Sequence, residues 1–247
     1  YRDGRGFYTR VDLARGEISA VGSKITPGIV HDCLFWDDRT FVLTSGGIRS
    51  SKIKESMDFK VVTKSSLMLV DWPSGTISKE IFLERPNEMI SHLSVDPLTK
   101  KLILLTSSND RNGPGKGRIY FLSPGDSSLR RLEMPDSLEN QLGIEMLSVA
   151  INPTNGIACV THPRPGLLLT VDVRNERLIA DSEIPSLGAV YDPQQSQFVF
   201  NSGTLKGQLV ALDQNGLNKK YVSFDSKPDF HSISSHGLLI QRDGDFG

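Results

Sequence analysis

One pattern repeats along this chain, and no other feature of the sequence restricts the fold as strongly. Each copy has a short apolar segment, a polar turn, a second apolar segment and a variable loop, followed by a third apolar segment, a turn with Gly or Asn, and a fourth segment. The copies begin near Cys33, His92, Leu147 and Gly188, about 40 to 60 residues apart. A four-stranded blade of a β-propeller takes roughly 40–45 residues. The sequence therefore predicts an all-β protein, with a single β-propeller domain of four-stranded antiparallel blades over residues 1–247.

The repeat also places individual strands. We expect them at 33–36, 40–44, 67–70 and 76–81 in the first copy, 92–95, 102–105 and 118–122 in the second, 147–151, 157–160 and 168–172 in the third, and 188–191, 198–200 and 208–212 in the fourth. The polar segment 49–64 is predicted to be a loop, because it carries charges without an apolar period.

Incomplete copies lie at both ends of the sequence. Segments 7–13 and 17–21 resemble the third and fourth strands of a preceding blade, and 231–241 resembles the first two strands of a following one. The chain thus holds roughly four complete and two partial blades. Two alternatives follow: the partial blades join to close a five-bladed ring, or the chain is part of a longer propeller.

Recurring acidic turns support the repeat by their chemistry. Asp12, Asp71 and Asp213 each end a strand and are followed within four residues by Gly, and Asp172 holds the same place in the third copy. An Asp carboxylate accepts backbone N–H bonds in a turn, while Gly takes positive φ angles without strain. We therefore interpret these aspartates, and the pair Gly46-Gly47, as structural turn residues.

Composition restricts the partners. The 28 Lys and Arg residues against 29 Asp and Glu residues give a net charge of -1, which provides no general attraction for nucleic acid or anionic lipid. The longest apolar runs have strand length, so no membrane span is expected. The chain begins with Tyr1 and shows no secretory signal, so it is predicted to be a processed chain or a fragment. Cys33 and Cys159 lack zinc-type spacing, and their disulfide state stays open.

Histidines are the best candidates for ligand-facing residues. His31, His92 and His231 lie near the start of the first strand of their copies, and in a propeller that strand lines the central channel. Their imidazoles are predicted either to converge on a metal or an anionic ligand, or to fix each blade against its neighbour. His162 and Arg164 fall in a Pro-rich loop, where an exposed Arg suits a carboxylate.

The sequence contains no linear signature of an enzyme. It lacks a nucleophile elbow, a zincin motif and a P-loop, and the Gly-rich segment 113–117 precedes a predicted strand rather than a helix. Carboxylates from several blades remain able to assemble a site that no linear motif reveals. An enzyme therefore stays an alternative to a binding protein, and no cofactor is predicted.

Several segments carry a resemblance to a known family. The chain resembles a bacterial family catalogued as domain of unknown function 1513, in segments that lie in order and at compatible spacing: 30–34, 38–43, 45–48, 57–58, 65–71, 91–96, 148–150 and 161–164. The resemblance implies an exported, periplasmic propeller of about seven blades, often encoded beside imelysin-type and cytochrome-like iron-uptake proteins, with no established activity.

Three functions follow from the residues and the resemblance together. We expect a non-enzymatic scaffold of the bacterial envelope that is associated with iron acquisition and binds another envelope protein or a small ligand. The alternatives are a propeller that handles metal or haem with channel histidines, and an enzyme similar to lactonase or dehydrogenase propellers.

Overall fold

The computed structural model describes residues 5–12, 15, 17–27, 30–46, 49–50, 60–61, 64–72, 74–108, 115–201 and 208–223. Among the predicted features, Gly47, His231 and the strands at 231–241 lie outside the described residues.

Four antiparallel sheets of four strands each follow one another along the chain, and within each sheet the strands lie in chain order. The first sheet contains β3 (Val30–Phe35), β4 (Thr40–Ser45), β7 (Ser66–Asp71) and β8 (Thr76–Phe82). The second contains β9 (Glu88–Val95), β10 (Leu102–Ser108), β11 (Ile119–Leu122) and β12 (Arg130–Arg131). The third contains β13 (Ser148–Ile151), β14 (Ile157–His162), β15 (Leu167–Asp172) and β16 (Arg177–Glu183). The fourth contains β17 (Ala189–Asp192), β18 (Gln197–Asn201), β19 (Gln208–Asp213) and β20 (Lys219–Ser223).

Shorter elements accompany the sheets. The hairpin of β1 (Arg5–Asp12) and β2 (Glu17–Pro27) precedes the first sheet, as the partial copy at 7–21 predicts. The predicted loop at 49–64 contains a two-residue ladder, β5 (Arg49–Ser50) with β6 (Lys60–Val61). A one-turn helix, α1 (Asp136–Glu139), lies between the second and third sheets. Within the described residues, no helix has the length and apolar character needed to cross a membrane.

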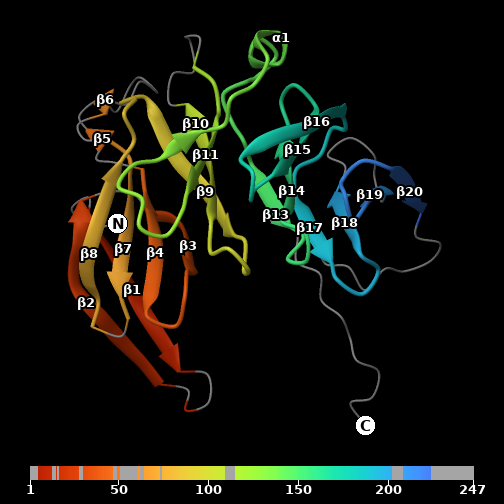
Figure 1. Ribbon diagram of the computed structural model, residues 1–247. Coiled ribbons are helices and arrows are strands. Elements are labelled where there is room, and N and C mark those ends of the chain that lie inside the picture. Colours follow the sequence, from red (N-terminus) through yellow and green to blue (C-terminus); the bar gives the residue numbers. More distant parts are fainter. Residues whose placement is uncertain are drawn as a thin grey trace.

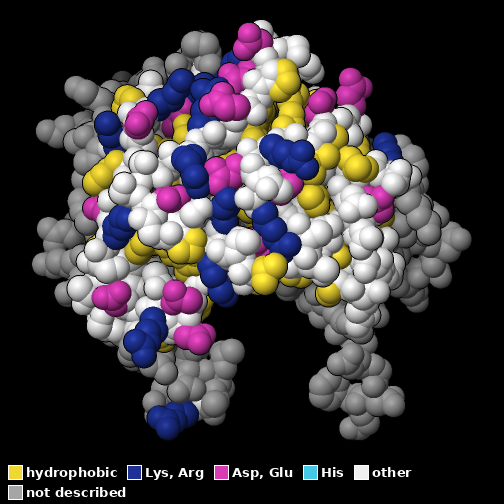
Figure 2. All heavy atoms as spheres, in the orientation of Figure 1, with side chains coloured by type: hydrophobic (Ala, Val, Ile, Leu, Met, Phe, Trp, Pro, Cys, Tyr) yellow, Lys and Arg dark blue, Asp and Glu magenta, His cyan; other side chains and the backbone are white. Residues whose placement is uncertain are grey.

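The four sheets form an arc (Figure 1). Their first strands, β3, β9, β13 and β17, lie on the concave side and contact one another in that order, while β8, β16 and β20 lie on the outside. On the face shown in Figure 2, Lys and Arg side chains are interspersed with Asp and Glu side chains, as the balanced composition implies.

Apolar cores fill the spaces between neighbouring sheets. Successive side chains of a strand point to opposite faces of its sheet, so the run 102–105 serves two cores at once. Leu102 and Leu104 belong to the core shared with the first sheet, whereas Ile103 and Leu105 belong to the core shared with the third. A third core joins the third and fourth sheets around Phe198 and Phe200. Burial on both faces explains why these strands have continuous apolar sequences rather than alternating ones.

Polar contacts link the same neighbours. In the second, third and fourth sheets, the turn between the third and fourth strands is contacted by the sheet before it. In chain order, the linked residues of the preceding and following sheets are Lys79 and Asp126, Asp96 and Arg174, and Asn152 and Gln214.

The two cysteines lie in different sheets, Cys33 exposed on β3 and Cys159 buried on β14. Both are free thiols.

Candidate functional site

Two of the predicted channel histidines meet between the first and second sheets, at what we call the first junction. The rings of His31 on β3 and His92 on β9 contact edge to face, with their centroids 4.8 Å apart. His31 Nδ1 lies 2.8 Å from the carbonyl oxygen of Ser91. His31 is exposed, whereas His92 is buried. The inner strands of two sheets are therefore joined through these imidazoles.

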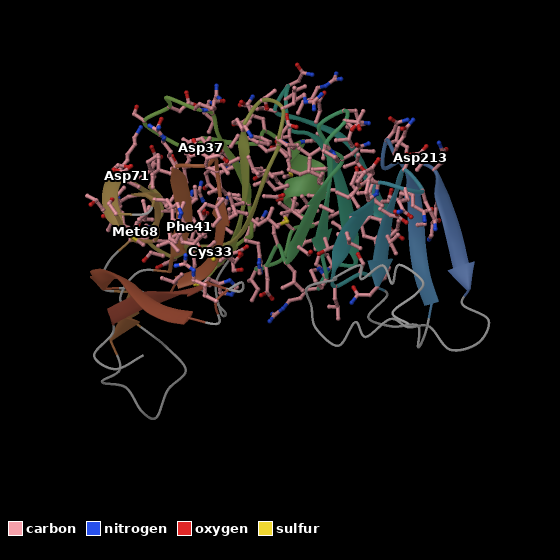
Figure 3. The ribbon with its side chains drawn as sticks, turned by 90° about the horizontal axis from the view of Figure 1, so that it is seen from below. Cys33, Asp37, Phe41, Met68, Asp71 and Asp213 are labelled. Carbon is pink, nitrogen blue, oxygen red and sulfur yellow. The ribbon has the colours of Figure 1, made fainter. Side chains whose placement is uncertain are left out.

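Asp32 adds a carboxylate to this group. Its Oδ2 lies 3.6 Å from His92 Nδ1 and accepts the backbone N–H of Leu93 at 3.1 Å, while its Oδ1 accepts the N–H of Cys33 at 2.8 Å. Burial raises the pKa of Asp32, but the hydrogen bonds from His92 and from the backbone of Cys33 and Leu93 together bring it below its ordinary value. Asp32 is therefore an ionised link from β3 to β9. The adjacent Cys33, labelled in Figure 3, has a thiol pKa raised by its partial desolvation on the sheet and by the charge of Asp32, which disfavours the nucleophilic thiolate.

A second cluster at the first junction buries a charge pair. Glu88 begins β9, Arg118 directly precedes β11, and Tyr120 lies on β11. Arg118 Nη1 forms an ion pair with Glu88 Oε1 and also donates to the carbonyl oxygen of Lys116 at 3.2 Å. Tyr120 donates its hydroxyl proton to Glu88 Oε2 at 2.8 Å. Burial and the neighbouring Glu88 charge raise the pKa of Tyr120 well above its usual range, so its hydroxyl stays protonated and acts as a donor.

Two pockets adjoin this cluster, and Arg85 lines both of them. The smaller, about 210 Å³, is bounded by Arg118, Lys116 and Glu88. The larger, about 420 Å³, is bounded by Tyr120 together with apolar side chains such as Leu83. The Arg85 side chain is 54% exposed, and its Nε lies 3.8 Å from Glu88 Oε1. The first junction thus combines concave surface with fixed charges, which is typical of ligand sites.

Glu88, Arg118 and Tyr120 were not predicted from the sequence. Glu88 and Arg118 are 30 positions apart, and only the pairing of β9, β10 and β11 brings them together. One signal was present for Arg118: it is a charged residue directly before the apolar run 119–122, whose burial also buries the charge.

His162 is not exposed to solvent. It ends β14 and is fully buried, its Nε2 accepts the backbone N–H of Gly143 at 2.7 Å, and its Nδ1 hydrogen-bonds the carbonyl oxygen of Glu145. Burial lowers its pKa to about 4, against the smaller opposing effect of the Glu145 carbonyl. The expectation that His162 lies in a loop is wrong, because β14 includes His162 and ends just before Pro163. Arg164 lies in the turn after β14 and is exposed.

The candidate turn aspartates lie at strand ends, and Figure 3 shows Asp71 and Asp213 toward opposite ends of the arc. Asp172 Oδ1 accepts the N–H of Asn175 at 3.0 Å, and Asp213 Oδ1 accepts the N–H of Asn215 at 3.0 Å. Asp71 accepts the N–H of Gly75 through its backbone oxygen at 2.9 Å, and Gly75 has a φ of 74°. Asp12 ends β1, and Gly46 is buried after β4.

A three-histidine metal site stays a prediction, because His231 lies outside the described residues. Among the residues that the structure does describe, no three His, Cys, Asp or Glu side chains are grouped so that they could hold a metal ion.

Comparison with known proteins identifies the architecture. The model of a family described as "Protein of unknown function (DUF1513)" matches residues 1–233. No curated protein matches the sequence. Similar solved structures include the calcium-binding protein regucalcin from Agrobacterium tumefaciens, with 15% identity and a TM-score of 0.54 over 87% of this chain and 66% of that one. They also include the Dos1 propeller, with 10% identity and a TM-score of 0.57 over 88% and 53%. Apo AztD from Citrobacter koseri has 16% identity and a TM-score of 0.51 over 85% and 51%.

These similarities confirm the predicted fold, an all-β propeller of four-stranded antiparallel blades. At such low identity they show the fold alone. The chain spans between half and two thirds of the length of these three proteins.

Proposed function

Because the chain belongs to the DUF1513 family and folds as a β-propeller, we propose that it is a non-enzymatic binding protein of the bacterial envelope. It holds a small ligand or another envelope protein without transforming it. Its periplasmic location and its association with iron acquisition are part of this proposal and rest on the family resemblance.

One observation carries the proposal: His31 and Asp32 of the first sheet, together with His92 of the second, join the two sheets. His31 contacts the backbone of β9, and Asp32 on β3 contacts both His92 and the N–H of Leu93. A general acid or base works best with a pKa near the working pH. The pKa of Asp32 is lowered, which keeps it ionised, and the pKa of Cys33 is raised, which keeps it a protonated thiol. Both shifts move the group away from neutral pH. Binding in the adjoining pockets requires no proton transfer.

A second function, metal or haem handling, is favoured by one distance, the 4.8 Å between the ring centroids of His31 and His92. Neutral imidazole is a common ligand for Zn, Cu and Fe. In the first function the histidines join two sheets, so their removal lowers stability. In the second they bind a metal, so their removal also abolishes metal binding.

The test is metal analysis of the purified full-length protein together with His31→Ala and His92→Ala, with Arg164→Ala as the exposed control. We expect a preparation without stoichiometric metal and a lower thermal midpoint in both histidine variants, because each loses contacts between the first two sheets. Stoichiometric metal that is lost in both histidine variants but kept in Arg164→Ala would overturn the proposal in favour of metal handling. Fractionation of the native host checks the location, and a cytoplasmic pool alone contradicts it.

A further inference from the structure

The Arg118 guanidinium has an incomplete set of partners. Its side chain is only 10% exposed. Nη1 serves both Glu88 and the carbonyl oxygen of Lys116, but Nε is buried and hydrogen-bonds no group in the described part of the chain. A buried donor without an acceptor is destabilising, and more so on a charged group. Such a donor in a folded protein calls for an explanation, and a bound anion is one.

The smaller pocket beside Arg118 has the charge that an anion requires. Three of its lining side chains are cations, Arg85, Lys116 and Arg118, and one is a carboxylate, Glu88. Lys116 Nζ donates to the carbonyl oxygen of Glu139 at 2.5 Å, so this lysine contributes mainly its positive field. Arg85 is half-exposed and stands between the two pockets. The excess of positive charge is therefore local, in a protein whose total charge is -1.

The geometry of a guanidinium defines the group that fits. Arg presents two edges with parallel N–H donors, and each edge matches the two oxygens of a carboxylate or a phosphate. In Arg118 the partners gather on Nη1, which leaves the edge formed by Nε and Nη2 without an acceptor among the described residues. A volume of about 210 Å³ admits a small anion or the charged end of a larger molecule.

We propose that this pocket, between the start of β9 and the segment before β11, is an oxyanion-binding site. It takes a carboxylate or phosphate group beside Arg118, the buried cation of its lining, with Arg85 as the second, outer cation. The inference deepens the proposed binding function, on which it rests, by naming the class of ligand. The adjoining 420 Å³ pocket, which shares Arg85 and includes Phe82, Leu83 and Leu129, gives apolar room for the remainder of such a ligand.

The experiment is a titration of the purified full-length protein with sodium acetate and, separately, with sodium phosphate, at constant ionic strength set with chloride. Binding is followed by calorimetry and by the shift of the thermal midpoint. We expect saturable binding of at least one anion, and the preferred anion assigns the ligand as a carboxylate or a phosphate. Arg85→Gln should weaken this binding about tenfold, since the outer cation is lost.

Two further variants make the result specific. Arg118→Lys keeps a charge beside Glu88 but lacks the second N–H edge. We expect its affinity for the anion to fall by at least about tenfold. Arg177→Gln, which removes an exposed arginine on β16, should bind like the wild type. If Arg118→Lys does not fold, Arg85→Gln against Arg177→Gln still decides the question.

Absence of saturable binding to either anion, or equal binding in wild type, Arg85→Gln and Arg118→Lys, overturns the site. That failure leaves the non-enzymatic binding function standing, because the latter is judged by metal content and location. Conversely, stoichiometric metal on the histidines with intact anion binding would overturn the function and not the pocket.

Discussion

The second sheet contributes a buried carboxylate to each of two arginine pairs, and the pairs differ in how many guanidinium nitrogens have an acceptor. Asp96, directly after β9, is fully buried and accepts Arg174 Nε at 2.9 Å and Arg174 Nη2 at 3.1 Å. Arg174 also donates to the carbonyl oxygens of Thr154 and Pro153, each at 3.1 Å. Every nitrogen of this guanidinium has an acceptor, and the pair joins the second sheet to the third.

Glu88 and Arg118 form the other pair, at the opposite end of β9. Here a single guanidinium nitrogen serves the carboxylate, Nε has no acceptor in the described part of the chain, and a pocket adjoins the pair. A pair with complete hydrogen bonding fixes architecture, whereas one with an unsatisfied donor beside a pocket has capacity left for a ligand. We call these the closed pair and the open pair.

The largest expected effect comes from breaking the open pair. Arg118→Ala removes the cation and leaves the Glu88 carboxylate buried and uncompensated, so the free energy of unfolding should fall by about 3–5 kcal/mol. Urea denaturation at neutral pH measures it. The exposed control Arg177→Ala should stay within about 0.5 kcal/mol of wild type. A loss under about 1 kcal/mol in Arg118→Ala would mean that solvent already reaches Glu88.

Acid titration sharpens the comparison through His162, a buried histidine on β14. This strand belongs to the third sheet, which the closed pair joins to the second. The pKa of His162 is lowered from 6.5 to about 4 on folding, so the folded state favours neutral imidazole. The resulting stability is complete above pH 6.5 and is lost as the pH falls toward 4, about 3 kcal/mol in total.

His162→Gln should remove the pH dependence of unfolding between pH 6.5 and 4, as measured by urea denaturation at several pH values. An unchanged slope in this variant would show that another group titrates there.

The closed pair gives the smallest of the three effects. Burial raises the pKa of Asp96, but the hydrogen bonds from Arg174 and Thr99 outweigh it and bring the pKa down from 3.8 to about 2. A carboxyl with a lowered pKa stabilises the fold above its unfolded value and loses that contribution as the pH falls through its folded value. Asp96 therefore contributes about 2 kcal/mol above pH 3.8, lost toward pH 2.

Asp96→Asn should lower the free energy of unfolding by about 2 kcal/mol at neutral pH and reduce the pH dependence below pH 3.8, where Asp32, whose pKa is also lowered, still titrates. Thermal unfolding at pH 7 and pH 3 measures both. Equal loss at the two pH values is expected only if the pair acts through packing rather than charge.

The fold was predictable from sequence because burial on both faces gives each strand a recognisable apolar run, as in 102–105 and 167–169. The fourth strands of the second, third and fourth sheets, β12, β16 and β20, were not predicted. β12 is only Arg130–Arg131 and has no apolar pattern, and β16 alternates exposed with half-buried residues instead of forming an apolar run. The ladder of β5 with β6 was not predicted either, because each strand has only two residues and no apolar pattern.

The candidate site was predictable only in part. His31 and His92 were found because strand position alone places them on the concave side. Arg118 was not, because its importance depends on which of its nitrogens has an acceptor, and a linear sequence does not contain that information. His162 was placed outside because Pro163 suggests a loop, yet the strand carries its side chain into the interior.

The contacts between strand-end turns and neighbouring sheets give the arc a polarity. Each sheet contacts the turn between the third and fourth strands of the next one, so every junction is head to tail and no two-fold axis relates its sides. The two sides of a sheet are consequently unlike: the second sheet offers the turn at Asp126 to Lys79 of the first sheet, and offers Asp96 to the turn at Arg174 of the third. Unlike surfaces associate heterologously, by adding units in one direction or by closing a ring, and not by pairing two identical ends face to face.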